Sequence, residues 1–493
     1  RANMFVDAFI NRQDWSDVVG RLDRISKITK QQIVDFVNRH FKDNYIAVYK
    51  RIGEDNTVKK IDKPQITAIP TNRDLQSQFV TDIINSKTED IQPKFVDFNT
   101  DLTKGETKKG LPVLYVKNTE NGRFTLYYYY KFGETSNKWL PYAAEYFNYL
   151  GTDKMTAEQL KQKFYELACS YYITVGSRDM SVSISGLAEN MPEAMKLMED
   201  FITNAKVDKD AYDKYVGIVE KSRTDNKLKQ RVNFSRLQYY GMYGKYSSAL
   251  NCPSSAELKE MDPQKLVDMI KDLKNYKHSV LYYGPMDMKE LTATVNKEHK
   301  TAKKLVDGPQ NKPYRLQQTT QNEVYIAPYE AKNIYMIQYH NEGKTWNAEQ
   351  EPIAALFNEY YGGGMNTVVF QELREARGLA YSAFAMYGTP GYKDDTEYAY
   401  TYIISQNDKM MDCINTFNSI LNTMPKSDKA FELAKQALMK RLASSRTTKF
   451  SIINAYLNAE NLGIDYDINK KIYEAVPSMT MDDVAKFEKE HMA

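Results

Sequence analysis

The feature that most constrains the fold of this chain is an internal repeat near its two ends. The run DWSDVVGRLDRISKITKQQIVDFVNRHF, residues 14–41, aligns without gaps on DYDINKKIYEAVPSMTMDDVAKFEKEHM, residues 465–492. Thr29 and Thr480 hold equal positions, each just before apolar residues at helical spacing, where an N-cap residue begins a helix. Two unrelated amphipathic helices would rarely match over this length. The repeat therefore predicts that residues 1–52 are the C-terminal tail of an upstream homologous domain.

A second repeat, of element types, fills the middle of the chain. Residues 106–300 and 321–493 both read in the order β-β-α-α-β-β-α from their hydrophobic periodicity. The runs AAEYFNYLG (143–151) and AALFNEYYG (354–362) fall in register, and the second copy is expected to open with a strand at 324–328. The sequence therefore predicts an α+β fold with two homologous domains, each an antiparallel-rich sheet packed with helices, plus the tail of a preceding copy.

Two polar stretches separate these parts. Residues 53–105 and 301–320 contain prolines and little periodicity, which is typical of linkers. At about 150 residues per domain, 493 residues suggest about three units, which agrees with two domains and a tail. The chain starts at Arg1 without a signal peptide, as expected of a segment of a longer protein or of a processed end.

Composition argues against several kinds of function. The 67 Lys+Arg and 64 Asp+Glu residues leave a net charge of +3, so the bulk charge predicts no nucleic-acid partner. No apolar stretch approaches 18 residues, so no membrane span is expected. The three cysteines, Cys169, Cys252 and Cys413, lie far apart, which excludes a CxxC metal site and a disulfide framework.

The histidines exclude one catalytic motif. There are five, and no two of them lie four residues apart. Helical zinc peptidases hold their metal with paired imidazoles at positions i and i+4 on one helix face. The chain therefore carries neither HExxH nor its inverse HxxEH.

The segment richest in candidate functional residues is GGGMNTVVFQELREARGLAYS, residues 362–382. No phosphate-loop pattern follows the glycines, which instead predict a helix–helix turn whose backbone can approach a neighbouring group closely. Arg374 and Arg377 lie on an expected helix over 366–377, without a carboxylate at i±3 or i±4. Two guanidinium groups followed by Tyr381 on the next strand are suited to bind carbonyl or carboxylate groups. The competing interpretation is a pair of solvated arginines and a packed strand tyrosine.

This segment resembles the signature of the insulinase (pitrilysin) family of zinc metallopeptidases and of their mitochondrial-processing-peptidase relatives. The resemblance extends over almost the whole chain except the linker. It implies four homologous α+β domains that close around a peptide chamber, with zinc and the general base held by HxxEH in the first domain. It also implies that an Arg and a Tyr of the fourth domain, seven residues apart, reach the bound peptide. Those positions are Arg374 and Tyr381, and Arg377 is a neighbouring candidate for substrate binding.

The chain departs from the family pattern where a zinc motif would lie in residues 106–300. Glu145, Asn148 and Tyr149 hold the places of the first His, the Glu and the second His. This trio cannot rebuild a zinc site. The segment therefore fits a third insulinase-type domain with a degenerate zinc motif, and no zinc is expected to be bound by this chain.

Together these observations predict the C-terminal half of a zinc-dependent metalloendopeptidase, inactive on its own. Zinc and the general base are expected from an N-terminal catalytic half, in the same polypeptide or in a separate chain, and the expected substrate is an unfolded peptide. The alternative is a non-catalytic scaffold or a peptide-binding subunit of the same fold. The compartment is left open between periplasm and cytoplasm.

Overall fold

The computed structural model describes residues 2–51, 53, 57, 77–87 and 89–492. They form two compact units, residues 1–87 and 88–493. Much of the predicted linker 53–105 lies outside the described residues.

Unit 1 consists of short helices without a core of their own. They are α1 (Ala2–Ile10), α2 (Trp15–Val19), α3 (Arg21–Ser26), α4 (Lys30–His40) and α5 (Gln78–Asn85). Thr29 is the N-cap residue of α4. Its side chain accepts a hydrogen bond from the N–H of Gln32, and the Gln32 side chain accepts one from the N–H of Thr29. Ala8 is the only buried side chain among those described in this unit. Most of the apolar side chains described in unit 1, among them Phe9, Leu22 and Ile46, are therefore exposed.

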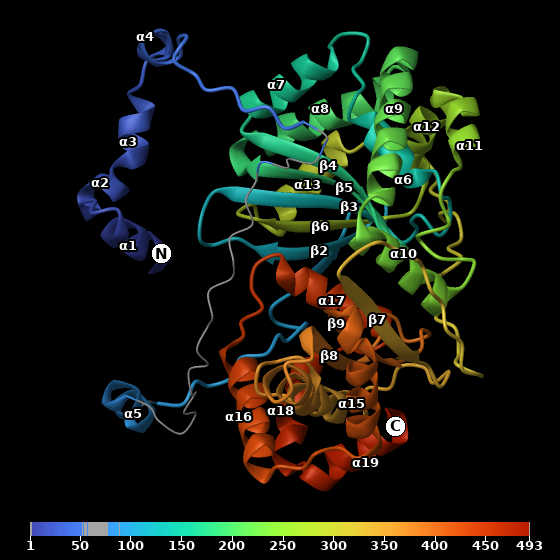
Figure 1. Ribbon diagram of the computed structural model, residues 1–493. Coiled ribbons are helices and arrows are strands. Elements are labelled where there is room, and N and C mark those ends of the chain that lie inside the picture. The colour runs from blue at the N-terminus through green and yellow to red at the C-terminus, as the bar shows by residue number, and fades with distance from the viewer. Residues whose placement is uncertain (1, 52, 54–56, 58–76, 88, 493) are drawn as a thin grey trace. The chain divides into compact units, whose positions relative to one another are not determined.

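The first sheet of unit 2 has six strands in the order β1-β2-β6-β3-β5-β4 (Figure 1). β2 and β6 run parallel, and the other neighbours are antiparallel. β6 is the last of the six in sequence but lies between β2 and β3, so the sheet is completed only when the end of this segment arrives. The strands are β1 (Thr103–Glu106), β2 (Pro112–Lys117), β3 (Arg123–Tyr130), β4 (Cys169–Val175), β5 (Met180–Leu187) and β6 (Ser279–Gly284).

Alternation along β3 shows how this sheet forms its core. Phe124, Leu126, Tyr128 and Tyr130 are buried, and the residues between them are half-buried, as the two-residue period of a strand requires. The buried face joins α6, α8 and α12 in one hydrophobic core. The helices of this part are α6 (Leu140–Phe147), α7 (Ala157–Glu166), α8 (Met191–Asn204), α9 (Lys209–Lys227), α10 (Gln230–Tyr243), α11 (Ser255–Glu260), α12 (Pro263–Lys271) and α13 (Met288–Glu298), with 3-10 turns η1 (Ala188–Asn190) and η2 (Asp272–Asn275).

The second sheet has three antiparallel strands in the order β7-β9-β8. They are β7 (Asn333–His340), β8 (Ala380–Gly388) and β9 (Tyr398–Gln406). Its core side packs on α14 (Glu351–Phe357), α15 (Met410–Asn422), α16 (Asp428–Ser444) and α19 (Met481–His491). The remaining elements are η3 (Asn358–Gly362), η4 (Phe370–Glu375), η5 (Asn407–Lys409), α17 (Ser451–Leu462), α18 (Ile468–Ala475) and η6 (Val476–Ser478).

The strand predicted at 324–328 is wrong, because these residues form no strand and Val324 and Ile326 are exposed. In the first sheet, the corresponding strand β2 pairs with β6, which follows α12. In the described part of the chain no strand follows α19, and residues 324–328 pair with none of the described strands.

Helix α17 joins the two halves of unit 2. Although it belongs to the second repeat, its buried Ile453 lies in one hydrophobic cluster with Leu114 and Val116 of β2 and Leu281 of β6. Asp395, in the connection between β8 and β9, also crosses between the halves, because it pairs with both Arg178 and Arg315.

The C-terminal part of the predicted linker is folded. Val96 and Phe98 are buried against Ala459 of α17, and β1 begins at Thr103. Among the described residues, none of the helices combines the length and the hydrophobicity that crossing a bilayer requires.

Candidate functional site

The glycine-rich segment lies between two π-helical turns, η3 and η4. The described residues contain no other π-helix. A π-turn has i→i+5 hydrogen bonds and is frequent at functional sites. The α-helix predicted over 366–377 is therefore wrong in its geometry, because the helical residues run from 368 to 375 and six of them, Phe370–Glu375, are π-helical.

The glycines allow a close approach to β8, as the sequence predicted. A Cβ atom on Gly363 would lie 2.9 Å from the Cβ of Phe384, and one on Gly362 would lie 3.0 Å from the carbonyl oxygen of Ala385. Larger residues would push the turn away from the strand. The hydroxyl of Thr367 donates to the Gly364 carbonyl at 2.7 Å and closes the turn.

The π-helical spacing gives Arg377 a partner that the sequence did not predict. Its guanidinium group forms an ion pair with Glu372 and also donates to the Glu372 carbonyl oxygen at 3.0 Å. The two residues lie five apart, which are neighbouring positions on a π-turn but not on an α-helix. The sequence signal for this pair is a carboxylate five residues before the arginine, on a helix that follows a glycine-rich stretch.

Arg374 lies on the same turn with its side chain exposed. Its guanidinium carbon is 4.9 Å from the centroid of the Phe370 ring, which is a cation–π contact. The contact restricts the stem of the side chain and leaves its N–H groups available to a ligand.

Tyr381 occupies an irregular position in β8. Ala380 pairs with Ser405 and Ser382 pairs with Ile404, so Tyr381 is an extra residue between two consecutive partners on β9. Such a bulge redirects a side chain and is common next to active sites. The Tyr381 side chain is 78% exposed, whereas its neighbour Ala380 is buried. The competing interpretation, a packed strand tyrosine, is therefore wrong.

The connection between Arg374 and Tyr381 is fixed from the core side. Gly378 has a φ of +58° and ends the helix, with its N–H donating to the Arg374 carbonyl at 3.0 Å. The Leu379 carbonyl accepts hydrogen bonds from Ser405 and Cys413. No hydrogen bond or ring contact joins the side chains of Arg374 and Tyr381, both of which the structure describes. The two side chains thus lie on one braced turn and remain independent of each other.

The degenerate trio of the first repeat has structural partners. The hydroxyl of Tyr215 donates to Glu145 at 3.3 Å, and the Asn148 amide donates to the Ala144 carbonyl at 3.2 Å. The ring of Tyr149 packs against Tyr215. Burial, and secondarily Glu145, raises the pKa of the Tyr215 hydroxyl. These contacts explain the trio without a ligand.

Within the described part of the chain, no three His, Cys, Asp or Glu side chains are arranged to hold a metal ion. Two histidines and a glutamate do form a buried hydrogen-bonded chain. His278 Nε2 lies 2.8 Å from His299 Nε2, and His299 Nδ1 lies 2.5 Å from Glu199. Burial lowers the pKa of His278 to about 4. The ring nitrogens are already hydrogen-bonded to one another and to protein oxygens, so this cluster is structural.

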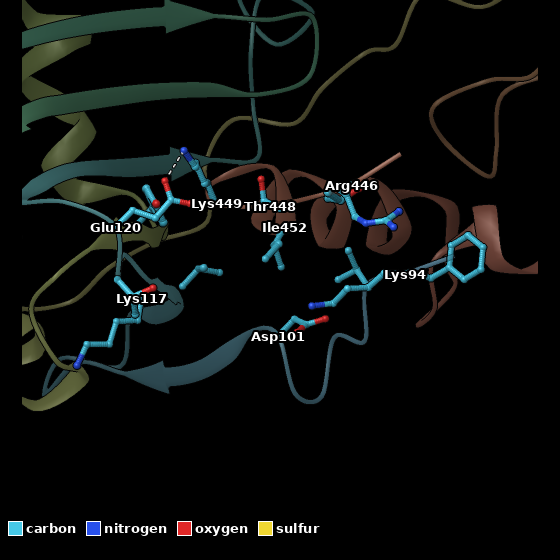
Figure 2. Close-up of a pocket in the computed structure, with 14 residues that line it drawn as sticks. Lys94, Asp101, Lys117, Glu120, Arg446, Thr448, Lys449 and Ile452 are labelled. Carbon is cyan, nitrogen blue, oxygen red and sulfur yellow. Dashed lines mark ion pairs between the residues drawn. The ribbon is translucent and has the colours of Figure 1, made fainter. Parts of the chain in front are cut away.

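Two of the cavities in the described part of unit 2 have charged or polar walls. The first, of about 420 Å³, lies between the end of β2 and the start of α17 (Figure 2). Its charged walls are partly satisfied, because Lys449 pairs with Glu120 at 2.7 Å and Arg446 donates to backbone carbonyls. The second, of about 740 Å³, lies between α6, α9 and α10 and includes Glu145. Neither cavity is lined by Arg374 or Tyr381.

Comparison with known proteins gives one family-model match and several solved structures of similar fold. Residues 261–438 match the family model described as the peptidase M16 inactive domain. Among solved structures, the peptidase M16 inactive domain from Pseudomonas fluorescens has a TM-score of 0.61 and 15% identity, covering 80% of this chain and 95% of that one. The periplasmic protease PqqL from Escherichia coli has a TM-score of 0.59 and 12% identity, covering 96% and 50%. No relative was found among curated protein sequences.

The ferredoxin protease FusC, solved with Arabidopsis ferredoxin, has a TM-score of 0.62 and 10% identity, covering 99% of this chain and 56% of that one. The chain thus spans about half the length of PqqL and of FusC. At these identities the structural likeness establishes the fold, which confirms the predicted α+β class.

The fold, together with the family-model match over residues 261–438, relates this chain to peptidases of the M16 class. The predicted resemblance to the insulinase (M16) family is confirmed, because residues 261–438 match the inactive M16 C-terminal domain and solved structures of the same fold include M16 and M16-like peptidase chains.

Proposed function

We propose that this chain is the non-catalytic half of a zinc-dependent M16 metalloendopeptidase, and that Arg374 and Tyr381 contact an unfolded peptide in its chamber. The observation that carries this proposal is that irregular backbone is concentrated around Arg374 and Tyr381. Among the described residues, both π-turns and the register shift between paired strands lie within 358–382. Irregular backbone of this kind is energetically costly and gathers at binding and catalytic sites.

The chemistry of the two side chains suits this role. Zinc held by the other half of the enzyme would activate the water that attacks the peptide. The side chains of Arg374 and Tyr381 each carry hydrogen-bond donors, and both are exposed on a braced turn. They hold the peptide backbone extended and stabilise negative charge on a carbonyl oxygen. Arg377 contributes less, because it must leave Glu372 to reach a substrate.

We expect Arg374→Ala and Tyr381→Phe each to lower peptide cleavage. Loss of one preorganised donor typically lowers kcat by on the order of 10²-fold. The measurement is kcat and KM for an unstructured fluorogenic peptide, with this chain combined with its catalytic half. A fall in kcat larger than the rise in KM identifies contacts that strengthen in the transition state.

Matched controls are Arg123→Ala and Tyr165→Phe, which change exposed residues of the same types on the first repeat. They are expected to keep full turnover. If Arg374→Ala and Tyr381→Phe also keep full turnover, the two residues have no part in the reaction.

The description of the matched family model as an inactive domain favours one second candidate, a peptide-binding or scaffold subunit. That function predicts peptide affinity without cleavage, unchanged by a zinc chelator. Fluorescence anisotropy of a labelled peptide, with and without chelator, separates the two functions.

A further inference from the structure

The tail repeat occurs three times in the chain, and the structure shows two copies in their packed state. Helices α4, α12 and α19 align without gaps, and each begins with a side-chain N-cap, at Thr29, Asp262 and Thr480. After the cap, the first core position holds Ile33, Leu266 and Val484 in turn. α12 packs on α6, and α19 packs on α14. Each packed copy therefore covers the first helix that follows the leading strands of its own repeat.

Burial separates the first copy from the other two. Leu266 and Val484 are 0% exposed, but Ile33 is 56% exposed. One turn upstream of the cap, Leu258 and Val476 are 0% exposed, and Ile25 is 49% exposed. Burial of an aliphatic side chain of this size is favourable for folding. Unit 1 thus carries the apolar pattern of a packed tail without the surface that covers it.

The residues after α4 show the same contrast. The segment after α12 becomes β6, which pairs with β2 in parallel and with β3 antiparallel. Residues 46–51, at the equivalent positions after α4, form no strand, and Ile46 and Val48 are 92% and 89% exposed. The first four of these residues, Ile-Ala-Val-Tyr, are apolar and include two β-branched side chains, which suits a central strand buried on both faces.

We propose that residues 14–51 complete the fold of a second M16-type domain by inserting a helix and a central strand into it. This inference rests on the proposed function, because the recipient belongs to the other half of the enzyme. α4 would pack on the recipient's counterpart of α6, and residues 46–51 would pair between its counterparts of β2 and β3. PqqL and FusC, which share the fold, have about as much chain again outside the matched part.

The position of β6 in the first sheet shows what such an inserted strand contributes. Without β6, the first sheet would separate into β1-β2 and β3-β5-β4, with unpaired backbone groups on both facing edges. A recipient that lacks residues 14–51 would have the same gap. The two halves of the enzyme therefore share one core and one sheet, which differs from docking between two finished surfaces.

Amide hydrogen exchange on the full chain tests this proposal, with and without the N-terminal half produced as a separate polypeptide. Exchange at residues 46–51 is expected to be unprotected in the chain alone and slowed at least about 100-fold in the complex. Protection of these amides in the chain alone would overturn the proposal. If the protection rises with chain concentration, the occupant is a second copy; if it does not, unit 1 packs within its own chain.

Two substitutions separate strand insertion from side-chain docking. Ile33→Asp buries a charge in the interface and is expected to weaken binding by at least about 100-fold. Val48→Pro removes a backbone donor and is expected to be as damaging, whereas a surface dock would tolerate it. Gln31→Asp, on the polar face of α4, is the control and is expected to bind normally. Normal binding of both Ile33→Asp and Val48→Pro would overturn the proposal. Because the readout is binding, a pair of halves that associates but cleaves no peptide contradicts the proposed function alone.

Discussion

At the scale of single residues, Glu488 has the least favourable environment for a charge. It is buried in α19, and its Oε1 atom has no hydrogen-bond partner among the described residues. Burial raises the pKa of the carboxyl group to about 7. The neighbouring Tyr361 hydroxyl is also unpartnered, and burial, then Glu488, raises its pKa. The folded chain therefore retains a proton on Glu488 at pH values where an exposed carboxyl group has already lost it.

This environment predicts a pH dependence of stability. The pKa of Glu488 is higher in the folded chain than its ordinary value of 4.5, so the folded state retains the proton longer. Its contribution is fully present below pH 4.5 and is lost as the pH rises through 7, by on the order of 3 kcal/mol in total. We expect Glu488→Gln to raise the melting temperature at pH 8 and to change it little at pH 5, as measured by scanning calorimetry.

Glu490→Gln, on the exposed side of the same helix, is the control and should behave like the unmodified chain at both pH values. A Glu488→Gln variant with no gain at pH 8 would show that the folded chain accommodates the ionised carboxylate.

At the scale of elements, the sequence predicts what depends on local periodicity and misses what depends on distant partners. The duplicated element order, the caps at Thr29 and Thr480 and the close glycine turn follow from local patterns. Residues 324–328 have the composition of a strand, but pairing requires a neighbour that local sequence cannot supply. The family resemblance selected Arg374 and Tyr381, and their roles stay a prediction.

The finer geometry of the candidate site could not be predicted because it violates the regular periods. On an α-helix the ion-pair partners of Arg377 would lie at i±3 and i±4, so the α-helical period does not predict its pair with Glu372 at i−5. Side chains alternate between the two faces of a regular strand, so the sequence also allowed Tyr381 to pack inside the sheet. The bulge appears only when the register against β9 is known.

The capping boxes at Thr29 and Thr480 give a prediction at this scale. Thr480→Ala removes the side-chain cap of a helix packed in the core, so we expect the free energy of unfolding of unit 2 to fall by about 1 kcal/mol. Thr29→Ala removes the same cap in unit 1, where α4 has no core, and should leave unit 2 unchanged. Urea unfolding followed by circular dichroism measures both. Equal losses would show that α4 takes part in the cooperative unfolding of unit 2.

At the scale of the whole molecule, unit 2 behaves as one body because α17 carries the second repeat onto the first sheet. Ile453 is fully buried in that contact. Ile→Ala changes in a core cost about 2–5 kcal/mol, and Ile→Val about 0.5–1.5 kcal/mol. We expect one calorimetric transition for unit 2 in the unmodified chain and in Ile453→Val, and two transitions in Ile453→Ala. A single transition in all three would mean that Asp395 and the remaining contacts couple the halves without α17.

The extra residue in β8 also has an evolutionary consequence. Ala380 and Ser382 already face consecutive residues of β9, so deleting one codon, that of Tyr381, would leave a regular strand with its core side unchanged. The same event would remove the exposed phenol. A descendant of this gene would thus lose the side chain and keep the fold in one step.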